Sequence, residues 1–333
     1  MVALNVVYDP LHVLRAPKDV DVYDRQARYG HAGIVRHTGT GDVFIGSSVF
    51  QDLSEDVYTQ KTGRNMTRLP VPGASPLELY EVTDTLLAHH AGTIDKIVLG
   101  MDFFVWGKSS QEAKWDVFPQ HLYNDIPFVP VQYAGSFETF SRLVRLMPDY
   151  YLLEGRDRTY QTRYRATYAH GMGRDDVFTH ACKILDKKRA QVDGLSYENV
   201  TRNMKLYVQR LLNDYPKTEF VFLLPSYSLL EYAQYQEFGK LSDFLKFREK
   251  LGVMSLNDDR LAVIDAQSNV DVIQNLDIFY DATHGGQEVL DPFFSAPVIH
   301  NRETIYLNSG RISKAVRFDG RSMYKDMIES CVS

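Results

Sequence analysis

The stretch that decides the fold is Val43-Phe44-Ile45-Gly46-Ser47-Ser48. Three consecutive β-branched or aromatic residues predict a short buried strand. A glycine then allows a sharp turn where the strand ends, and two serines follow. In folds where helices alternate with parallel strands, ligands bind outside the carboxyl ends of the strands. The sequence therefore predicts that Ser47 and Ser48 lie where a hydroxyl can meet a substrate.

Other segments indicate that this strand belongs to a parallel sheet. Segments of the same short, apolar kind are Val43–Gly46, Ile94–Met101, Glu219–Leu224 and Leu261–Asp265. Helical patterns separate them, and a β-α-β order implies parallel strands covered by helices on both faces. We therefore predict an α/β fold with a parallel central sheet.

Three helices between these strands are well specified. Ser75-Pro76-Leu77-Glu78 combines a capping serine, an early proline and a glutamate three residues after the serine, which predicts a capped helix directly after Gly73. Apolar residues at helical spacing predict further helices over about 197–215 and 229–251, the second broken near Gly239.

The range 104–173 is the least regular part of the chain. It holds several prolines, a short helical pattern at about 137–146, and a basic and aromatic run at 160–165. We predict one domain over 1–333, in which 104–173 is an insertion that forms a lid or a substrate wall. One hypothesis is that the run at 160–165 lines a groove for an anionic glycan. The alternative is that it forms a solvated face of the surface.

Composition excludes several classes of function. The chain has 333 residues and a net charge of -6, which argues against general nucleic-acid binding. Its two cysteines, Cys182 and Cys331, form no metal-binding motif, and their spacing leaves open whether they pair. No apolar stretch approaches the roughly 18–20 residues of a membrane-spanning helix. The apolar start Met1–Tyr8 nevertheless suggests the hypothesis of an upstream anchor that has been removed.

The residues Asp281-Ala-Thr-His284 offer what a serine needs to become a nucleophile. A hydroxyl is a weak nucleophile until an imidazole accepts its proton and a carboxylate orients that imidazole. An Asp and a His three residues apart can lie on one side of a turn. The combination predicts acyl chemistry at Ser48, with His284 as the base.

Each of these features also has a plainer interpretation. Ser48-Val49-Phe50-Gln51 is itself a capping pattern, and Val49, Phe50 and Leu53 resemble the start of a helix. Gly73 is consistent with an ordinary turn. Carboxylate and imidazole groups such as those of Asp281 and His284 also bind metals, although no further ligand cluster lies nearby in the sequence.

Taken together, the motifs resemble the SGNH (GDSL-like) hydrolase superfamily. The order matches: Gly46-Ser47-Ser48, a glycine before a helix (Gly73), Gly100-Met101-Asp102, and Asp281-x-x-His284. The resemblance implies a three-layer α/β/α fold and no cofactor or metal. It further implies that Ser48 is the nucleophile, that His284 is the base and that Asp281 orients it. Gly73 and the Ser48 amide would bind the oxyanion, with Ser47 and Asp102 at the same substrate site.

More narrowly, the chain resembles the extracytoplasmic branch that modifies bacterial surface polymers, including the alginate O-acetylation and teichoic acid D-alanine transfer proteins. Phe44–Ser48, Gly73–Glu78, Val98–Phe104 and Phe222–Ser226 carry this likeness. It implies a periplasmic or extracytoplasmic location, an acylated polysaccharide substrate, other polysaccharide-biosynthesis proteins as partners, and no nucleic acid.

One departure concerns Asp102, which stands where many SGNH enzymes have an asparagine that binds the oxyanion. An ionised carboxylate repels an oxyanion, so Asp102 must be protonated, turned away or structural. Asn65 and Asn124 are candidates to supply the missing amide that binds the oxyanion. The sequence thus leaves two functions open: an SGNH-type serine esterase or O-acyltransferase, and a catalytically weak polysaccharide-binding or scaffold protein of an export complex.

Overall fold

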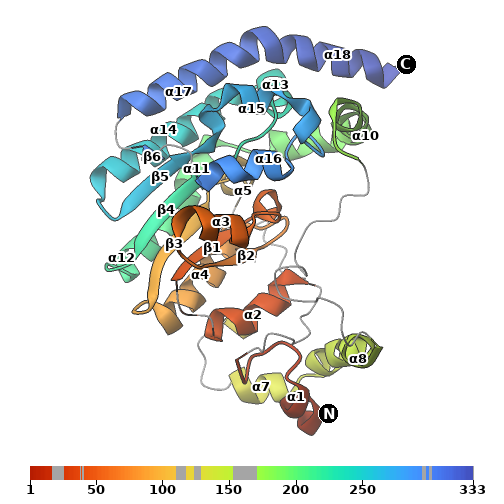
Figure 1. The fold of residues 1–333 in the computed structure, drawn as a ribbon, viewed down its shortest axis with the longest axis vertical. Coiled ribbons are helices and arrows are strands. Elements are labelled where there is room, and N and C mark those ends of the chain that lie inside the picture. Colours follow the sequence, from red (N-terminus) through yellow and green to blue (C-terminus); the bar gives the residue numbers. More distant parts are fainter. Residues whose placement is uncertain are drawn as a thin grey trace.

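The computed structural model describes residues 1–16, 26–37, 39, 41–109, 118–123, 129–152, 171–294, 298–299 and 302–332. Within them, one sheet has the strand order β2-β1-β3-β4-β5-β6 (Figure 1). Strands β1 to β5 pair in parallel, and β6 pairs antiparallel with β5. The predicted α/β class with a parallel central sheet is confirmed.

All four predicted strands are present, and two more were missed. The predicted strands are β1 (Gly41–Gly46), β3 (Ile94–Gly100), β4 (Glu219–Leu224) and β5 (Leu261–Asp265); the missed ones are β2 (Met66–Pro70) and β6 (Val298–Ile299). The strand β2 lies at the edge of the sheet. Edge strands tolerate polar residues and proline, so Arg68 and Pro70 concealed it.

Helices cover both faces of the sheet (Figure 1). On one face, α4 (Pro76–His90) contacts β1 and α12 (Gln209–Asp214), and α14 (Leu241–Asn257) contacts β5 and α11 (Tyr197–Asn203). On the other lie α3 (Glu55–Thr62) and α16 (Gln287–Leu290). The predicted three-layer arrangement is therefore observed.

Local signals explain the ends of these helices. Ser75 Oγ accepts a hydrogen bond from the Glu78 amide, and the Glu78 carboxylate accepts one from the Ser75 amide, so α4 begins with the predicted capping box. Helix α13 (Leu229–Glu237) stops before Gly239, whose φ of 73° is a conformation that glycine adopts readily. The π-helical segment η3 (Met204–Val208) joins α11 to α12 across the predicted range 197–215.

The remaining described elements surround this core. They are α1 (Val2–Tyr8), α2 (Ala27–His37), η1 (Ser48–Phe50), α5 (Phe103–Trp106), α6 (Gln120–Tyr123), α7 (Val129–Gly135), α8 (Phe137–Leu152), α10 (Arg174–Asp193), η4 (Ala266–Ser268), α15 (Val270–Gln274), η5 (Leu276–Ile278), η6 (Asp291–Phe294), α17 (Arg302–Ala315), η7 (Val316–Gly320) and α18 (Arg321–Val332). In the described part of the chain, no helix is long and apolar enough to cross a membrane.

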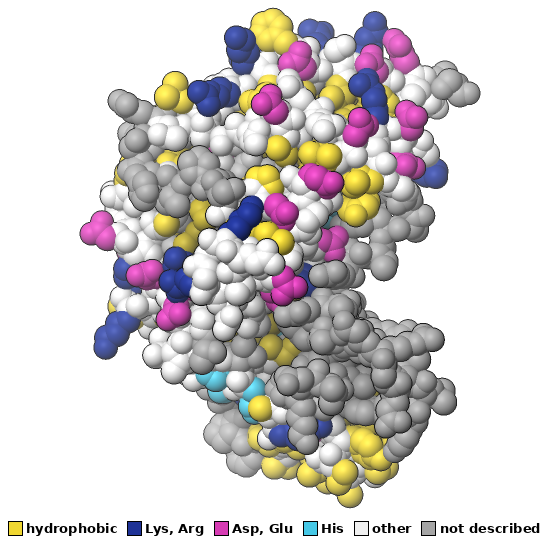
Figure 2. Space-filling view, in the orientation of Figure 1, with side chains coloured by type: hydrophobic (Ala, Val, Ile, Leu, Met, Phe, Trp, Pro, Cys, Tyr) yellow, Lys and Arg dark blue, Asp and Glu magenta, His cyan; other side chains and the backbone are white. Residues whose placement is uncertain are grey.

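The predicted insertion is only partly described, because the run at 160–165 and most of its neighbours lie outside the described residues. Helix α1 packs against α7 and α8 from that range, at the lower end of the molecule in Figure 1. Apolar side chains gather at this end (Figure 2), where Val7, Val131 and Phe137 are each more than two-thirds exposed. Whether the whole range acts as a lid stays a prediction.

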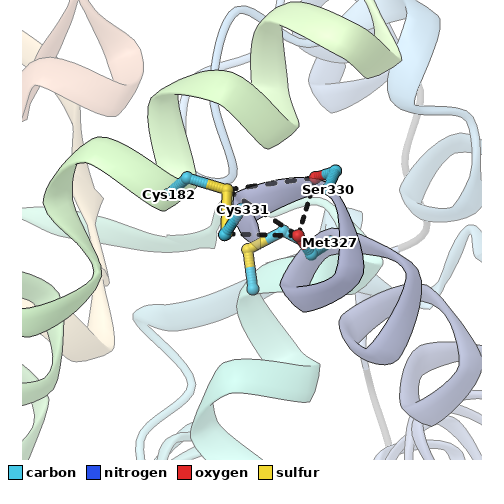
Figure 3. Close-up of a disulfide and its surroundings, with 4 residues drawn as sticks. All are labelled: Cys182, Met327, Ser330 and Cys331. Carbon is cyan, nitrogen blue, oxygen red and sulfur yellow. Dashed lines mark hydrogen bonds between the residues drawn. A yellow bond between two sulfur atoms is a disulfide. The ribbon is translucent and has the colours of Figure 1, made fainter. Parts of the chain in front are cut away.

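The two cysteines form a disulfide between α10 and α18 (Figure 3). The bond joins residues 149 positions apart, so it closes a long loop in the unfolded chain. The sequence left this pairing open, because spacing in the chain does not reveal which side chains meet in the fold.

Removing the disulfide should destabilise the protein. A cross-link over so long a loop restricts the unfolded chain and is worth about 2–5 kcal/mol. We expect the free energy of unfolding of C182S/C331S to be lower by an amount in this range. Circular dichroism should show this as a midpoint at lower denaturant concentration. Dithiothreitol should lower the midpoint of the wild type and leave that of the double variant unchanged. Equal midpoints for the oxidised wild type and the variant would contradict this expectation.

Candidate active site

Ser48 lies two residues after the end of β1, at the carboxyl edge of the sheet. The glycines at the ends of β1 and β3 create room for one aromatic ring: a Cβ added to Gly46 or Gly100 would lie 2.7 or 2.4 Å from the Phe50 ring. Gly46 does not adopt a positive φ, so it serves here to admit the ring rather than to allow a special backbone turn. Phe50 is fully buried and thereby holds the serine turn against the sheet.

The helix expected to begin at Ser48 is absent. Only the single 3₁₀ turn η1 follows, and its capping residue is Ser47, whose Oγ accepts from the Val49 amide. The α-helix starts at Glu55 behind the cap Ser54. Ser54 is followed by two acidic residues that favour a helix N-terminus, and this stronger start signal prevails over the capping pattern at Ser48.

The structure brings Ser48, His284 and Asp281 together. Ser48 Oγ lies 3.0 Å from His284 Nε2, and His284 Nδ1 lies 2.9 Å from Asp281 Oδ2. A carboxylate can only accept a hydrogen bond, so Nδ1 carries the proton of the neutral ring. Nε2 then carries the lone pair that accepts the proton of the Ser48 hydroxyl. The geometry is that of a nucleophile, a base and an orienting acid.

The loop that carries the imidazole is folded by Asp281 itself. Asp281 Oδ1 accepts hydrogen bonds from the amides of Thr283 and His284, both at 2.8 Å, a local pattern typical of aspartate in turns. Gly285 follows, where a Cβ would lie 2.5 Å from the side chain of Val289. The short spacing Asp-x-x-His is therefore enough to place both side chains on one turn.

Electrostatics favour a charged aspartate beside a basic imidazole. Burial lowers the pKa of His284, but the hydrogen bond and charge of Asp281, with the charge of Asp102, outweigh it and raise the pKa above 6.5. Burial raises the pKa of Asp281, but its hydrogen bonds to His284 and Thr283 reverse this and hold the pKa well below its usual range. The Asp281 carboxylate is therefore ionised whenever the ring accepts a proton.

Two backbone amides are available to bind a negative oxygen. Ser48 and Gly73 both line the same cavity, and neither N–H donates to another backbone group of the described residues. Gly73 has a φ of 63°, which favours glycine at this position. Arg28 fastens the Gly73 loop: its guanidinium binds both Glu78 oxygens, at 2.7 and 3.0 Å, and lies 3.5 Å from the Gly73 carbonyl.

Asp102 and Ser47 form hydrogen bonds with other groups of the protein. Ser47 Oγ donates to Asp102 Oδ2 at 2.9 Å, Tyr227 Oη donates to Oδ1, and the Phe104 amide also donates to Oδ1 at 2.8 Å. Burial and then the charge of Asp102 raise the pKa of Tyr227 well above 10, so Tyr227 remains a donor. Asp102 thus caps α5 and accepts from two hydroxyls, which fits the structural alternative and leaves no hydrogen to offer an oxyanion.

The two asparagines considered as substitutes do not fill this role. Asn65 precedes β2 and its carbonyl accepts from the Asp42 amide near the start of β1. It therefore lies at the amino edge of the sheet, at the opposite end of the strands from Ser48. Asn124 lies outside the described residues.

Helix α10 forms a wall of the cavity that the sequence did not predict. The cavity has a volume of about 210 Å³, and α10 contributes His180, Ile184 and Lys188 to its lining. These residues recur every four positions and so share one face of the helix. From the described part of 104–173, only Phe104 and Val105 line it. The disulfide anchors this wall helix to α18 (Figure 3).

Two kinds of residue were missed for different reasons. Tyr227 follows β4, so the rule that drew attention to the serines after β1 applies to it as well. By contrast, the pattern of α10 shows which residues face inward but not what they face. Among the described residues, no group of three or more His, Cys, Asp or Glu side chains is placed to hold a metal ion.

Comparisons with known proteins add little. No protein-family model matches the chain, and no curated protein matches it. It is similar to a solved structure from Streptococcus pneumonia, described as that of a candidate platelet activating factor. The identity is 12%, the match covers 85% of this chain and 92% of that chain, and the TM-score is 0.42. A likeness this distant says nothing about activity, and the site is therefore assigned from its geometry.

Proposed function

We propose that the protein is an SGNH-type serine esterase or O-acyltransferase. The observation that carries the proposal is the hydrogen bond of 3.0 Å between Ser48 Oγ and His284 Nε2, together with Asp281 on the far side of the ring. The amides of Ser48 and Gly73 donate to no other backbone group of the described residues, and a cavity lies at the same place. They add an oxyanion site and room for an acyl group.

The proposed reaction has two halves. His284 Nε2 takes the Ser48 proton while Oγ attacks the acyl carbon, and the amides of Ser48 and Gly73 bind the oxygen that becomes negative. The alcohol leaves with the proton from His284, so an acyl-enzyme remains. Water or a second hydroxyl then gives its proton to His284 and attacks the acyl carbon. As the bond from that carbon to Ser48 Oγ breaks, His284 returns the proton to Oγ, which regenerates the serine.

We further propose that the substrate is an acylated, first of all acetylated, bacterial surface or secreted polysaccharide. The motif resemblance motivates this substrate class. The disulfide supports an extracytoplasmic location, because such bonds persist in oxidising compartments. Polysaccharide-biosynthesis partners and an upstream membrane anchor belong to the same hypothesis.

A fluorophosphonate probe tests the enzyme proposal directly. An activated serine attacks such a probe, whereas an unactivated hydroxyl does not. We expect one covalent addition, located on Ser48 by peptide mass spectrometry. Release of acetate from acetylated polysaccharide, compared with transfer to an added sugar, then separates hydrolase from transferase. A protein that stays unlabelled favours the alternative function of a weakly active polysaccharide-binding or scaffold protein, which the Asp102 carboxylate motivates.

The pH dependence of activity should follow His284. The ring must be neutral to accept the serine proton, so kcat/KM should fall as pH falls through its raised pKa, which lies above 6.5. In D281N the main cause of the raised pKa is lost, so the acid limb should move to lower pH while the rate drops. D277N, an exposed aspartate in the same region, is the control. An acid limb at the same pH in D281N would contradict the assignment.

A further inference from the structure

The cavity lining includes a buried amide whose oxygen has no hydrogen-bond partner among the described residues. Gln234 on α13 is 1% exposed and belongs to the lining. Its Oε1 has no hydrogen-bond partner among the described residues. Buried acceptors are almost always satisfied, because an unsatisfied one is unfavourable. A donor from outside the described residues is therefore expected at Gln234, and a bound substrate can supply it.

An ammonium group with a spare hydrogen lines the same cavity. Lys188 Nζ donates to Glu231 Oε1 at 2.6 Å and to Thr283 Oγ1 at 3.5 Å. An ammonium has three hydrogens, so one makes no hydrogen bond within the described chain, where the head group also lies 5.2 Å from the centre of the Phe104 ring. Glu231 and Gln234 are three residues apart on α13 and thus share a helix face. This places the Lys188 head group within about one helical turn of the Gln234 amide.

We propose that Gln234 and Lys188 form a subsite for a hydroxyl group of the substrate. A hydroxyl can donate to Gln234 Oε1 and accept from Lys188 Nζ at once, which matches the one spare acceptor and one spare donor. It also satisfies the amide in either orientation of its oxygen and nitrogen. The proposal deepens the function proposed above and rests on it.

Other substrate groups fit less well. The charge of Lys188 is already balanced by Glu231, which is fully buried, so an anionic group gains little from it. A plain alkyl group leaves the Gln234 amide unsatisfied. The hydroxyl has two sources in an acylated glycan: the acyl group itself, or the sugar alcohol next to the ester.

Paired esters distinguish these sources. In the acyl arm, kcat/KM for p-nitrophenyl glycolate is compared with that for p-nitrophenyl acetate. In the alcohol arm, methyl 6-O-acetylglucoside is compared with cyclohexylmethyl acetate. For each arm, kcat/KM for the hydroxylated ester is divided by kcat/KM for the plain ester. In one of the two arms, we expect Q234M to lower this ratio by about tenfold or more relative to the wild type. The arm that responds identifies the source.

The control is Q236M, which removes the same group from an exposed glutamine of α13 that does not line the cavity and should leave both ratios unchanged. Because Q234M removes an unsatisfied amide, its Tm without substrate should be no lower than that of the wild type. Unchanged ratios in both arms, or a lowered Tm with unchanged ratios, would overturn the proposal in favour of a water-bound or structural amide. Fluorophosphonate labelling of Ser48 in the same samples shows separately whether the proposed function holds.

Discussion

Replacing Ser48 with alanine should lower ester turnover by about 10⁴-fold to 10⁶-fold, the loss typical of removing a triad nucleophile. The hydroxyl is the group within hydrogen-bond distance of His284 Nε2, so its removal leaves no atom to form the acyl-enzyme. What activity remains should come from water held near the imidazole and the amides of Ser48 and Gly73. The measurement is kcat on p-nitrophenyl acetate, with enzyme concentration set by absorbance.

The neighbouring serine supplies a matched comparison. Ser47 differs from Ser48 by one position, but its hydroxyl donates to Asp102 and is buried. S47A should therefore lower turnover far less, by about tenfold or less, through the loss of one neutral-to-charged hydrogen bond. Loss of labelling in S47A with retention in S48A would show that the wrong serine has been assigned.

Substituting Asp265 should cause the largest loss of stability. Arg248 on α14 binds both oxygens of Asp265 at the end of β5, at 3.0 and 2.6 Å, and both side chains are fully buried. Asn308 from α17 also donates to Asp265 Oδ2 at 2.8 Å. In D265L the Arg248 cation stays buried without its counter-charge, which destabilises by about 3–5 kcal/mol.

Equilibrium denaturation in urea, followed by tryptophan fluorescence, measures this loss as a lower midpoint. The double variant R248M/D265L should recover much of it, because a pair of apolar side chains replaces both buried charges. D214N breaks the exposed pair of Arg210 and Asp214 and should change the free energy of unfolding by less than about 1 kcal/mol. A D265L midpoint equal to that of D214N would contradict a stabilising role for the buried pair.

Elements with strong local signals were predictable. The strands β1, β3, β4 and β5 are short apolar runs, and the first residues of α4 form a capping box. Each of these elements could therefore be located without knowledge of its neighbours. The edge strand β2 escaped because Arg68 and Pro70 interrupt its apolar pattern. The Arg68 side chain is nevertheless buried, and it lies 3.9 Å from the Glu55 carboxylate. The prediction of a helix beginning at Ser48 was wrong, because Ser54, only six residues further on, caps the helix instead.

In the candidate site, too, the residues that share one turn were predictable, whereas those that depend on distant partners were not. Asp281 and His284 share one turn, so their spacing alone suggested that they meet. The roles of Asp102 and of α10 were hidden, because each depends on partners contributed by distant strands and helices. Asp102 is satisfied by Tyr227, 125 positions away, and no local pattern indicates that contact.

By itself, the sequence determined the alternation of strands and helices, the chemical types available for a proton relay, and the turn that joins acid to imidazole. All of these depend on residues within a few positions of one another. Only the tertiary structure decided that a hydroxyl and an imidazole 236 positions apart lie 3.0 Å from each other. It also decided that Cys182 meets Cys331 and that Gln234 lines the cavity. Such contacts follow from how the sheet and its helices pack, which no short stretch of chain encodes.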